Sequence, residues 1–281
     1  MKPFRISEAA VFIYKVNMIN IESLIRDLEL VRGKSPLIHN ITNYVVMNNT
    51  ANALLSIGAS PVMAHAIDEV SDMVRISSAL VLNIGTIDAV WEEAMLNAGN
   101  TARENNIPVV FDPVGVGATP YRASVCRQII KVCKPSIIRG NASEIIALTD
   151  ITAKTKGVDS TDSSDIALES AKKLALKTGA VVVISGQTDY ITDGHKTGTV
   201  LNGNHLMARV TGMGCTATAI VAAFAAVNSD MFTAAIHGMS VMGITGEIAA
   251  RKSEGNGSMQ VHFLDELYNL DGGAIKNNIR L

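Results

Sequence analysis

The stretch ALVLNIGTIDAVWEEAMLNAGNTARENNIPVVFD, residues 79–112, decides the fold of this chain. It opens with an apolar run of strand length (79–84) and closes with another (107–112). Between these runs, residues 89–105 place apolar side chains at helical spacing. A strand, a helix and a second buried strand in this order predict a βαβ unit with parallel strands.

The same alternation continues on both sides of this unit. Further strands are expected at 36–40, 60–64, 136–139 and 180–185, and further helices at 43–57, 70–76, 121–132, 141–148, 166–177, 215–227 and 231–252. Two short runs joined through Asp193-Gly194, at 190–192 and 197–201, predict an antiparallel hairpin. The sequence therefore predicts an α/β fold of three αβα layers, with a mostly parallel central sheet and an antiparallel hairpin at one edge.

Length and composition predict one large domain. The chain has 281 residues, of which 48% are hydrophobic and 18% charged, enough to bury a sizeable core. An amphipathic pattern begins directly after Met18, so we expect residues 1–17 to be an extension and residues 18–281 to form a single domain. Translation could begin at Met1 or at Met18.

Charge, aromatic content and cysteine usage narrow the class of protein. A formal net charge of −2 with 4% aromatic residues argues against nucleic-acid binding. No apolar segment is long and free enough of charge to span a bilayer, so we expect a soluble protein without a membrane partner. Cys126, Cys133 and Cys215 have neither zinc-site nor disulfide-scaffold spacing, which favours a reducing cytoplasm.

A glycine turn precedes the apolar helical run 217–227. Residues 211–216 read TGMGCT, and Gly212 and Gly214 let the backbone N–H groups around Met213 converge at a helix N-terminus. This arrangement predicts an anion site, with Cys215 able to take or orient a proton beside it. The alternative is a tight connection followed by an inert core cysteine.

Polar residues at the predicted strand ends point to magnesium and phosphate. Active sites of open parallel sheets lie beyond the carboxyl ends of the strands, where Asp112 and Arg139 are expected. Asn141 and Glu144 share a helix face, and oxygen ligands of this kind suit Mg²⁺. A forked guanidinium such as that of Arg139 can bind phosphate. The alternatives are an Asp-Pro turn, a capped helix and a surface ion pair.

Six segments together resemble the hydroxyethylthiazole kinase family, in their order and approximate spacing. They are NITN (40–43), GASPVM (58–63), NIGT (83–86), DPVGVGAT (112–119), RGNASE (139–144) and GMGC (212–215). The resemblance implies a ribokinase-like fold and ATP-dependent phosphorylation of 4-methyl-5-(2-hydroxyethyl)thiazole in thiamine salvage. It also implies a homotrimer with active sites between subunits.

Carried over by position, the resemblance assigns roles to individual residues. It implies Asp112 and Glu144 at magnesium, Arg139, Ser185 and Asn141 at ATP, Asn43, Met63 and Gly212 around the thiazole, and the turn Gly212, Met213, Gly214 with Cys215 at the reacting groups. Related kinases have an Asp base where this chain has Cys215. The chain also departs from the family at Tyr44, Met213 and Met259, which puts the shape of the substrate pocket in question.

Other functions fit parts of the same pattern. A kinase for another small alcohol, or a nucleotide-dependent repair enzyme of the ribokinase-like class, would keep the fold and change the substrate. A dinucleotide-binding protein is suggested by the spacing of Gly212, Gly214 and Ala217 with Asp230 further on, but no strand is expected after this helix to complete a βαβ unit. A non-catalytic ligand-binding module would share the fold without turning over ATP.

Overall fold

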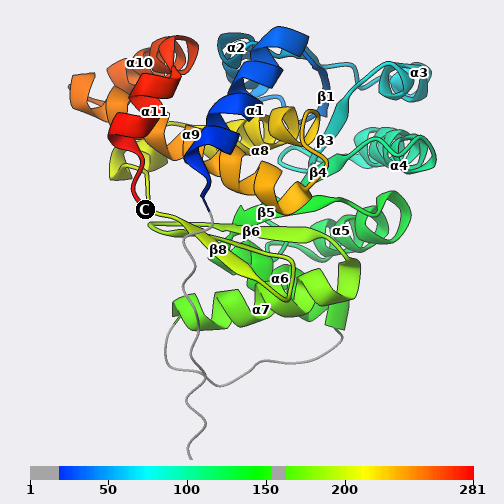
Figure 1. The fold of residues 1–281 in the computed structure, drawn as a ribbon. Helices are drawn as coiled ribbons and strands as arrows, with labels where there is room; N and C mark the ends of the chain where they lie inside the picture. The colour runs from blue at the N-terminus through cyan, green and yellow to red at the C-terminus, as the bar shows by residue number, and fades with distance from the viewer. Residues whose placement is uncertain (1–18, 154–162) are drawn as a thin grey trace, which may run out of the picture.

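The structure, a computed structural model, describes residues 19–153 and 163–281. Its centre is an eight-stranded sheet in the order β2-β1-β3-β4-β5-β6-β7-β8 (Figure 1). The strands are β1 (Leu37–Ile41), β2 (Ser60–Val62), β3 (Ala79–Asn83), β4 (Val109–Asp112), β5 (Ile137–Asn141), β6 (Val181–Ser185), β7 (Asp189–Thr192) and β8 (Thr197–Val200). Pairing is parallel from β2 to β6 and antiparallel at β7 and β8. The expected sheet and its edge hairpin are thus confirmed.

Helices cover both faces of the sheet, which makes three layers. One face packs α1 (Ile21–Lys34), α2 (Met47–Ile57), α8 (Met213–Ala225), α9 (Met231–Lys252), α10 (Asn256–Asn269) and α11 (Gly272–Asn278). The other packs α3 (Val70–Arg75), α4 (Ala89–Glu104), α5 (Pro120–Cys133), α6 (Ala142–Ala153) and α7 (Ser163–Thr178). Alternation along β3 explains this division, because Val81 enters the first core while Leu80 and Leu82 enter the second.

Helix α2 begins later than the sequence predicts. The expected start was residue 43, but residues up to Val46 form a turn, in which the Val46 N–H donates to the carbonyl of Asn43 at 3.2 Å. The reason is that the Asn43 side chain is buried and bonded to other loops. The expected strand 60–64 also ends early, at Val62.

Two helices near the C-terminus were not expected from the sequence. Helix α10 buries Met259, Phe263 and Leu267, which are four residues apart and therefore share one helix face. Ser258 accepts the N–H of Gly255 at 3.2 Å and so helps to begin this helix. The short helix α11 follows it.

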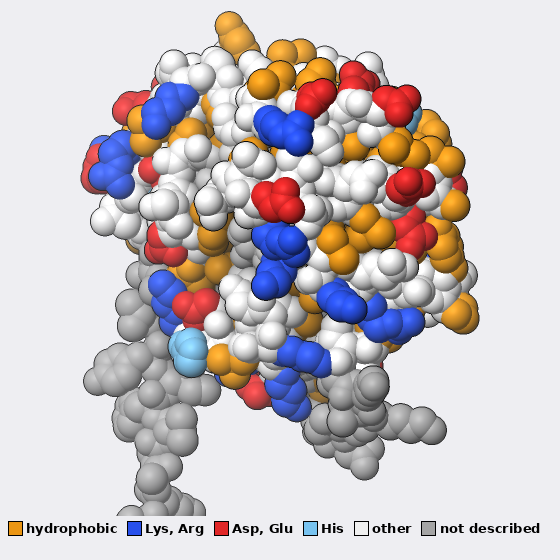
Figure 2. All heavy atoms as spheres, turned by 90° about the vertical axis from the view of Figure 1, so that its right-hand side faces the viewer, with side chains coloured by type: hydrophobic (Ala, Val, Ile, Leu, Met, Phe, Trp, Pro, Cys, Tyr) orange, Lys and Arg blue, Asp and Glu red, His pale blue; other side chains and the backbone are white. Residues whose placement is uncertain are grey.

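The outer surface near α3, α4 and α5 carries both signs of charge. Figure 2 shows acidic and basic side chains interspersed with hydrophobic ones on this face. No helix in the described part of the chain is long and apolar enough to cross a membrane. The expected extension, residues 1–17, lies outside the described residues.

Candidate active site at the strand ends

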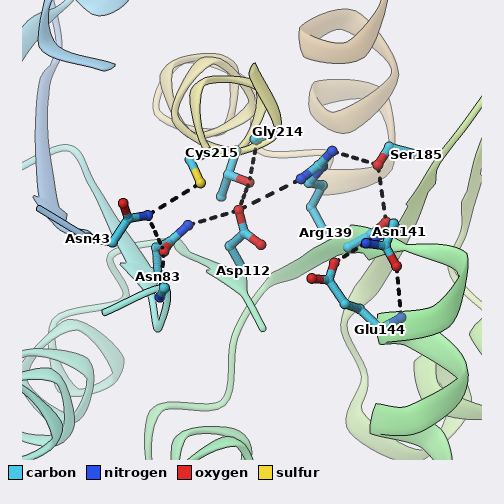
Figure 3. Close-up of polar contacts among 12 residues, drawn as sticks. Asn43, Asn83, Asp112, Arg139, Asn141, Glu144, Ser185, Gly214 and Cys215 are labelled. Carbon is cyan, nitrogen blue, oxygen red and sulfur yellow. Dashed lines mark hydrogen bonds and ion pairs between the residues drawn. The ribbon is translucent and has the colours of Figure 1, made fainter. Parts of the chain in front are cut away.

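The polar strand ends meet at one edge of the sheet, as the parallel topology requires. Asn83 lies opposite Asp112 in the register of β3 and β4. Asn141 lies opposite Ser185 in the register of β5 and β6. The N-terminus of α8 faces this edge and brings Gly214 and Cys215 to it (Figure 3).

The glycine turn has the conformation expected of an anion site. Gly212 adopts φ 86° and precedes α8, and a Cβ there would come within 2.7 Å of Val46. A Cβ on Gly214 would come within 2.7 Å of Arg139 Nη1, so glycine permits this close approach. The N–H groups of Gly214 and Cys215 have no hydrogen-bond partner among the described residues. They are free to bind an anion at the N-terminus of α8.

Asp112 is the centre of the polar network. Its Oδ2 accepts hydrogen bonds from Asn83 Nδ2 at 3.0 Å and Thr218 Oγ1 at 2.8 Å. Arg139 Nη1 lies 3.8 Å from the same oxygen. Burial raises the pKa of Asp112 to about 6, although the nearby charge of Arg139 opposes this shift. Sequence reasoning missed Thr218, which lies four residues after Gly214 and therefore on the same helix face.

Arg139 links the centre to the end of β6. Its Nη2 donates to Ser185 Oγ at 2.5 Å, and Ser185 Oγ donates in turn to the carbonyl of Gly140 at 3.3 Å. The buried Nε of Arg139 has no partner among the described residues. Arg139 and Ser185 are therefore held together with donor capacity left over, as a phosphate-binding pair requires.

Glu144 and Asn141 form a reciprocal cap at the start of α6. Asn141 Oδ1 accepts the N–H of Glu144, and Glu144 Oε2 accepts the N–H of Asn141, both at 2.9 Å. The other carboxylate oxygen of Glu144, Oε1, accepts the N–H of Gly115 at 2.9 Å. The carboxylate of Glu144 thus caps helix α6 and also belongs to the candidate metal site.

The oxygen atoms at this edge fit a partly hydrated Mg²⁺. Asp112 Oδ1 is buried and has no partner among the described residues, so it is available as a ligand. Each oxygen of Glu144 accepts a single hydrogen bond from the described residues and retains a lone pair. Within 19–153 and 163–281 no three His, Cys, Asp or Glu side chains cluster. Two carboxylates would hold Mg²⁺ together with water and phosphate oxygens.

Cys215 and Asn43 lie on the opposite side of Asp112 from Arg139 (Figure 3). Asn43 Nδ2 donates to Cys215 Sγ at 3.4 Å and to Asn83 Oδ1 at 2.9 Å. Burial and then the charge of Asp112 raise the pKa of the Cys215 thiol. The thiol is therefore protonated at neutral pH and can orient a hydroxyl group rather than act as a strong base.

Met63 lies outside the polar network. It follows β2, is partly buried, and its carbonyl lies 3.2 Å from His65 Nδ1. Tyr44 and Val45 are 59% and 64% exposed, so the surface beside Asn43 is open and apolar. Tyr44 packs against the Trp91 ring at a centroid distance of 4.7 Å.

A cavity of about 890 Å³ opens beside Arg139, Ser185 and Gly214. Methionines 239 and 242 of α9 also line it, together with residues of the segment 201–208 and Arg280. Buried Asp189, which sequence reasoning missed, also lines it and accepts the Gly186 N–H at 2.9 Å. Burial raises the pKa of Asp189 to about 6. The volume is large enough for a nucleotide-sized ligand.

The topology after the glycine turn excludes a dinucleotide-binding βαβ unit at this place. Helix α8 is followed by α9, α10 and α11, and the described chain has no strand after β8. A Rossmann fingerprint would need a strand on each side of the helix.

Comparison with known proteins gives a consistent result. Residues 28–272 match the hydroxyethylthiazole kinase family. A hydroxyethylthiazole kinase of Leptospira biflexa is 55% identical over 259 residues, which cover 92% of this chain and 97% of the relative. A hydroxyethylthiazole kinase structure from Pyrococcus horikoshii has a TM-score of 0.86 at 38% identity, covering 92% of this chain and 98% of the other. A ribokinase-like superfamily protein from Enterococcus faecalis shares the fold, with a TM-score of 0.61 at 12% identity and coverages of 84% and 87%.

Proposed function

Since the chain belongs to the hydroxyethylthiazole kinase family, we propose that it transfers the terminal phosphoryl group of ATP to the hydroxyl group of 4-methyl-5-(2-hydroxyethyl)thiazole, in thiamine salvage. The observation that carries the proposal is the approach of Arg139 to Asp112 beside the free N–H groups of Gly214 and Cys215, next to a cavity that Arg139 and Gly214 line.

The phosphate groups of ATP bind on the Arg139 side. Arg139 and Ser185, with Asn141 nearby, hold the phosphate oxygens. The turn formed by Gly212, Met213 and Gly214 presents the free N–H groups of Gly214 and Cys215 to the phosphoryl group in transfer. Catalysis of this reaction depends mainly on alignment and on neutralising phosphate charge. The guanidinium of Arg139 and the free backbone N–H groups of Gly214 and Cys215 supply both the alignment and the neutralising charge.

Magnesium completes the phosphate side. Asp112 and Glu144 hold Mg²⁺ through carboxylate oxygens, and the orphaned Oδ1 of buried Asp112 supports this role. When bound, the ion neutralises charge on the transferring phosphate. Glu144 also fixes the Gly115 loop beside Asp112, so Glu144→Ala should lose much of the activity by weakening metal positioning.

The thiazole alcohol binds on the other side of Asp112. Asn43, Met63 and Gly212 surround the ring, and Asn43 holds Cys215 so that the protonated thiol orients the hydroxyl group. The transferred phosphoryl group takes up the proton that the hydroxyl group loses, since the oxygens of Asp112 are engaged by the metal, Asn83 and Thr218.

The exposed apolar surface at Tyr44 and Val45 supports a homotrimer in which a second subunit covers the alcohol side. We place the enzyme in the cytoplasm, where ATP is available and Cys126, Cys133 and Cys215 stay free thiols, as they are here.

An ADP-release assay with four alcohols tests the proposed function. Hydroxyethylthiazole should be phosphorylated in the presence of ATP and Mg²⁺, whereas hydroxymethylpyrimidine, pyridoxal and ribose should give little turnover. Activity restricted to one of the other three alcohols would reject the assignment in favour of another small-alcohol kinase. ATP binding without turnover of any alcohol would indicate a ligand-binding module.

A further inference from the structure

Arg122 of α5 binds the backbone of two loops that carry the polar network. Its Nη1 donates to the carbonyl of Ile84 at 2.7 Å and to that of Val114 at 2.8 Å. Its Nη2 donates to the carbonyl of Gly85 at 2.8 Å. One guanidinium thus joins the loop that follows β3 to the loop that follows β4.

One of these peptide groups leads directly to Glu144. The carbonyl of Val114 and the N–H of Gly115 belong to the same peptide group, and that N–H donates to Glu144 Oε1 at 2.9 Å. The guanidinium holds one end of the peptide while the carboxylate holds the other. Because hydrogen bonds in a chain polarise one another, the charge of Arg122 strengthens the bond to Glu144.

A second peptide group leads to Asp112. The carbonyl of Ile84 and the N–H of Gly85 form one peptide group, and this N–H donates to Asn83 Oδ1 at 2.9 Å. Asn83 Nδ2 then donates to Asp112 Oδ2 at 3.0 Å. The hydrogen bond from the Gly85 N–H occupies the oxygen end of the Asn83 side-chain amide. The nitrogen end of that amide therefore faces Asp112.

The loops need this anchor because their shapes are unusual. Gly115 adopts φ 66°, and a Cβ on Gly85 would come within 2.7 Å of Asn43 Nδ2. Over residues 19–153 and 163–281, no carboxylate lies within ion-pair distance of Arg122. Within the described residues, the guanidinium donates its hydrogen bonds to these three carbonyl groups.

We infer that Arg122 is a positioning residue for phosphoryl transfer, which orients Glu144 and the Asn83–Asp112 pair through two peptide groups. The inference rests on the proposed function of Glu144 and Asp112. Arg122 touches neither carboxylate, and its effect reaches both through the backbone. Loss of such a supporting contact to a metal-binding side chain typically costs about 10- to 100-fold in metal affinity or activity.

The test compares Arg122→Met and Arg122→Lys with the control Arg127→Met. Arg127 is an exposed arginine of the same helix, and it forms no ion pair among the described residues. Arg122→Met should raise the half-saturating Mg²⁺ concentration about tenfold or more and lower kcat, with KM for the thiazole alcohol unchanged. Arg122→Lys keeps the charge and should recover part of the loss. Arg127→Met should behave as the wild type.

A binding measurement and a mutant cycle separate positioning from folding. Calorimetry measures Mg²⁺-dependent ADP binding without any turnover. In Arg122→Met, this binding should need a Mg²⁺ concentration about tenfold or more above that of the wild type. In a Glu144→Ala background, Arg122→Lys should change the Mg²⁺ dependence less than it does in the wild type, because only the route through Asn83 to Asp112 remains. Arg122→Lys carries the test if Arg122→Met fails to fold.

Independent, multiplicative effects, or a lowered Tm with unchanged Mg²⁺ dependence and kcat, would overturn the inference. Failure of the proposed function is a different result, because the wild type would then not phosphorylate the thiazole alcohol. ADP binding would still report on Arg122 in that case.

Discussion

The two sides of Asp112 differ in how completely one chain builds them. On the Arg139 side, buried polar groups surround a cavity of about 890 Å³. On the Asn43 side, Tyr44 is 59% exposed and Met63 is joined to the network by no hydrogen bond among the described residues. Under the proposed function, this difference predicts that a single chain forms the phosphate side and that a second subunit covering Tyr44 completes the alcohol side.

The largest effect should come from Asp112→Asn. The substitution removes the carboxylate at the centre of the phosphate side, and we expect kcat to fall about 10³-fold, as when a main electrostatic contact of a transition state is lost. Asp189→Asn is the matched control, because Asp189 is also buried in this half but bonds only the Gly186 N–H within the described residues. Steady-state kinetics with Asp112→Asn within tenfold of wild type would refute the central role of Asp112.

The pH dependence should also be set by the phosphate side. Since the pKa of Asp112 is raised to about 6, kcat/KM should fall about tenfold for each pH unit below that value. Folded Asp112 binds its proton more tightly than the unfolded chain does, because its pKa lies above the ordinary value of 3.8. Its contribution to the unfolding free energy therefore decreases as pH rises from about 4 to about 6.

Asp189 has a pKa raised to about 6 as well, so variants must separate the two groups. Asp189→Asn should keep the inflection in kcat/KM and lose part of the pH dependence of unfolding measured by denaturant titration. An inflection that disappears in Asp189→Asn would assign the titration to Asp189 rather than to Asp112.

Cys215 lies at the boundary of the two sides and should have a moderate effect. Because burial raises the pKa of its thiol, Cys215 supplies a hydrogen bond rather than a charge. Cys215→Ala should lower kcat about tenfold, equal to about 1.4 kcal/mol. Cys215→Ser should be nearer the wild type, and Cys215→Asp should retain transfer because a carboxylate can accept the proton. A loss of about 10³-fold or more in Cys215→Ser would show that the thiolate itself is required.

The smallest effect should come from the open side. Tyr44→Ala removes the ring contact with Trp91 and should raise KM for the thiazole alcohol about threefold, the scale of one aromatic pair. KM for ATP should not change. Tyr268→Ala, which removes another exposed tyrosine on α10, is the control. If Tyr44→Ala changes KM for ATP instead, the two sides are not separate in function.

The sequence predicted the meeting of the strand ends because parallel topology leaves few places for them. Asp112 ends β4 and Arg139 lies inside the neighbouring strand β5, two residues before its end, so a correct βαβ pattern was sufficient to bring them together. Helix α10 carried a readable signal in Met259, Phe263 and Leu267. The late start of α2 carried none, since it depends on tertiary bonds of Asn43 to Asn83 and Cys215.

Arg122 marks the limit of sequence reasoning most clearly. Its partners are backbone carbonyls, which every residue has, and Ile84 is 38 positions away in the chain. No side-chain pattern distinguishes such an arginine from exposed Arg127. Only the folded arrangement identifies it.

A crystal structure with Mg²⁺, a non-hydrolysable ATP analogue and hydroxyethylthiazole tests the central claim most directly. The terminal phosphoryl group should accept hydrogen bonds from the N–H groups of Gly214 and Cys215, with the alcohol oxygen in line between it and Asn43. A terminal phosphate bound away from these amides, or an alcohol on the Ser185 side of Asp112, would contradict it.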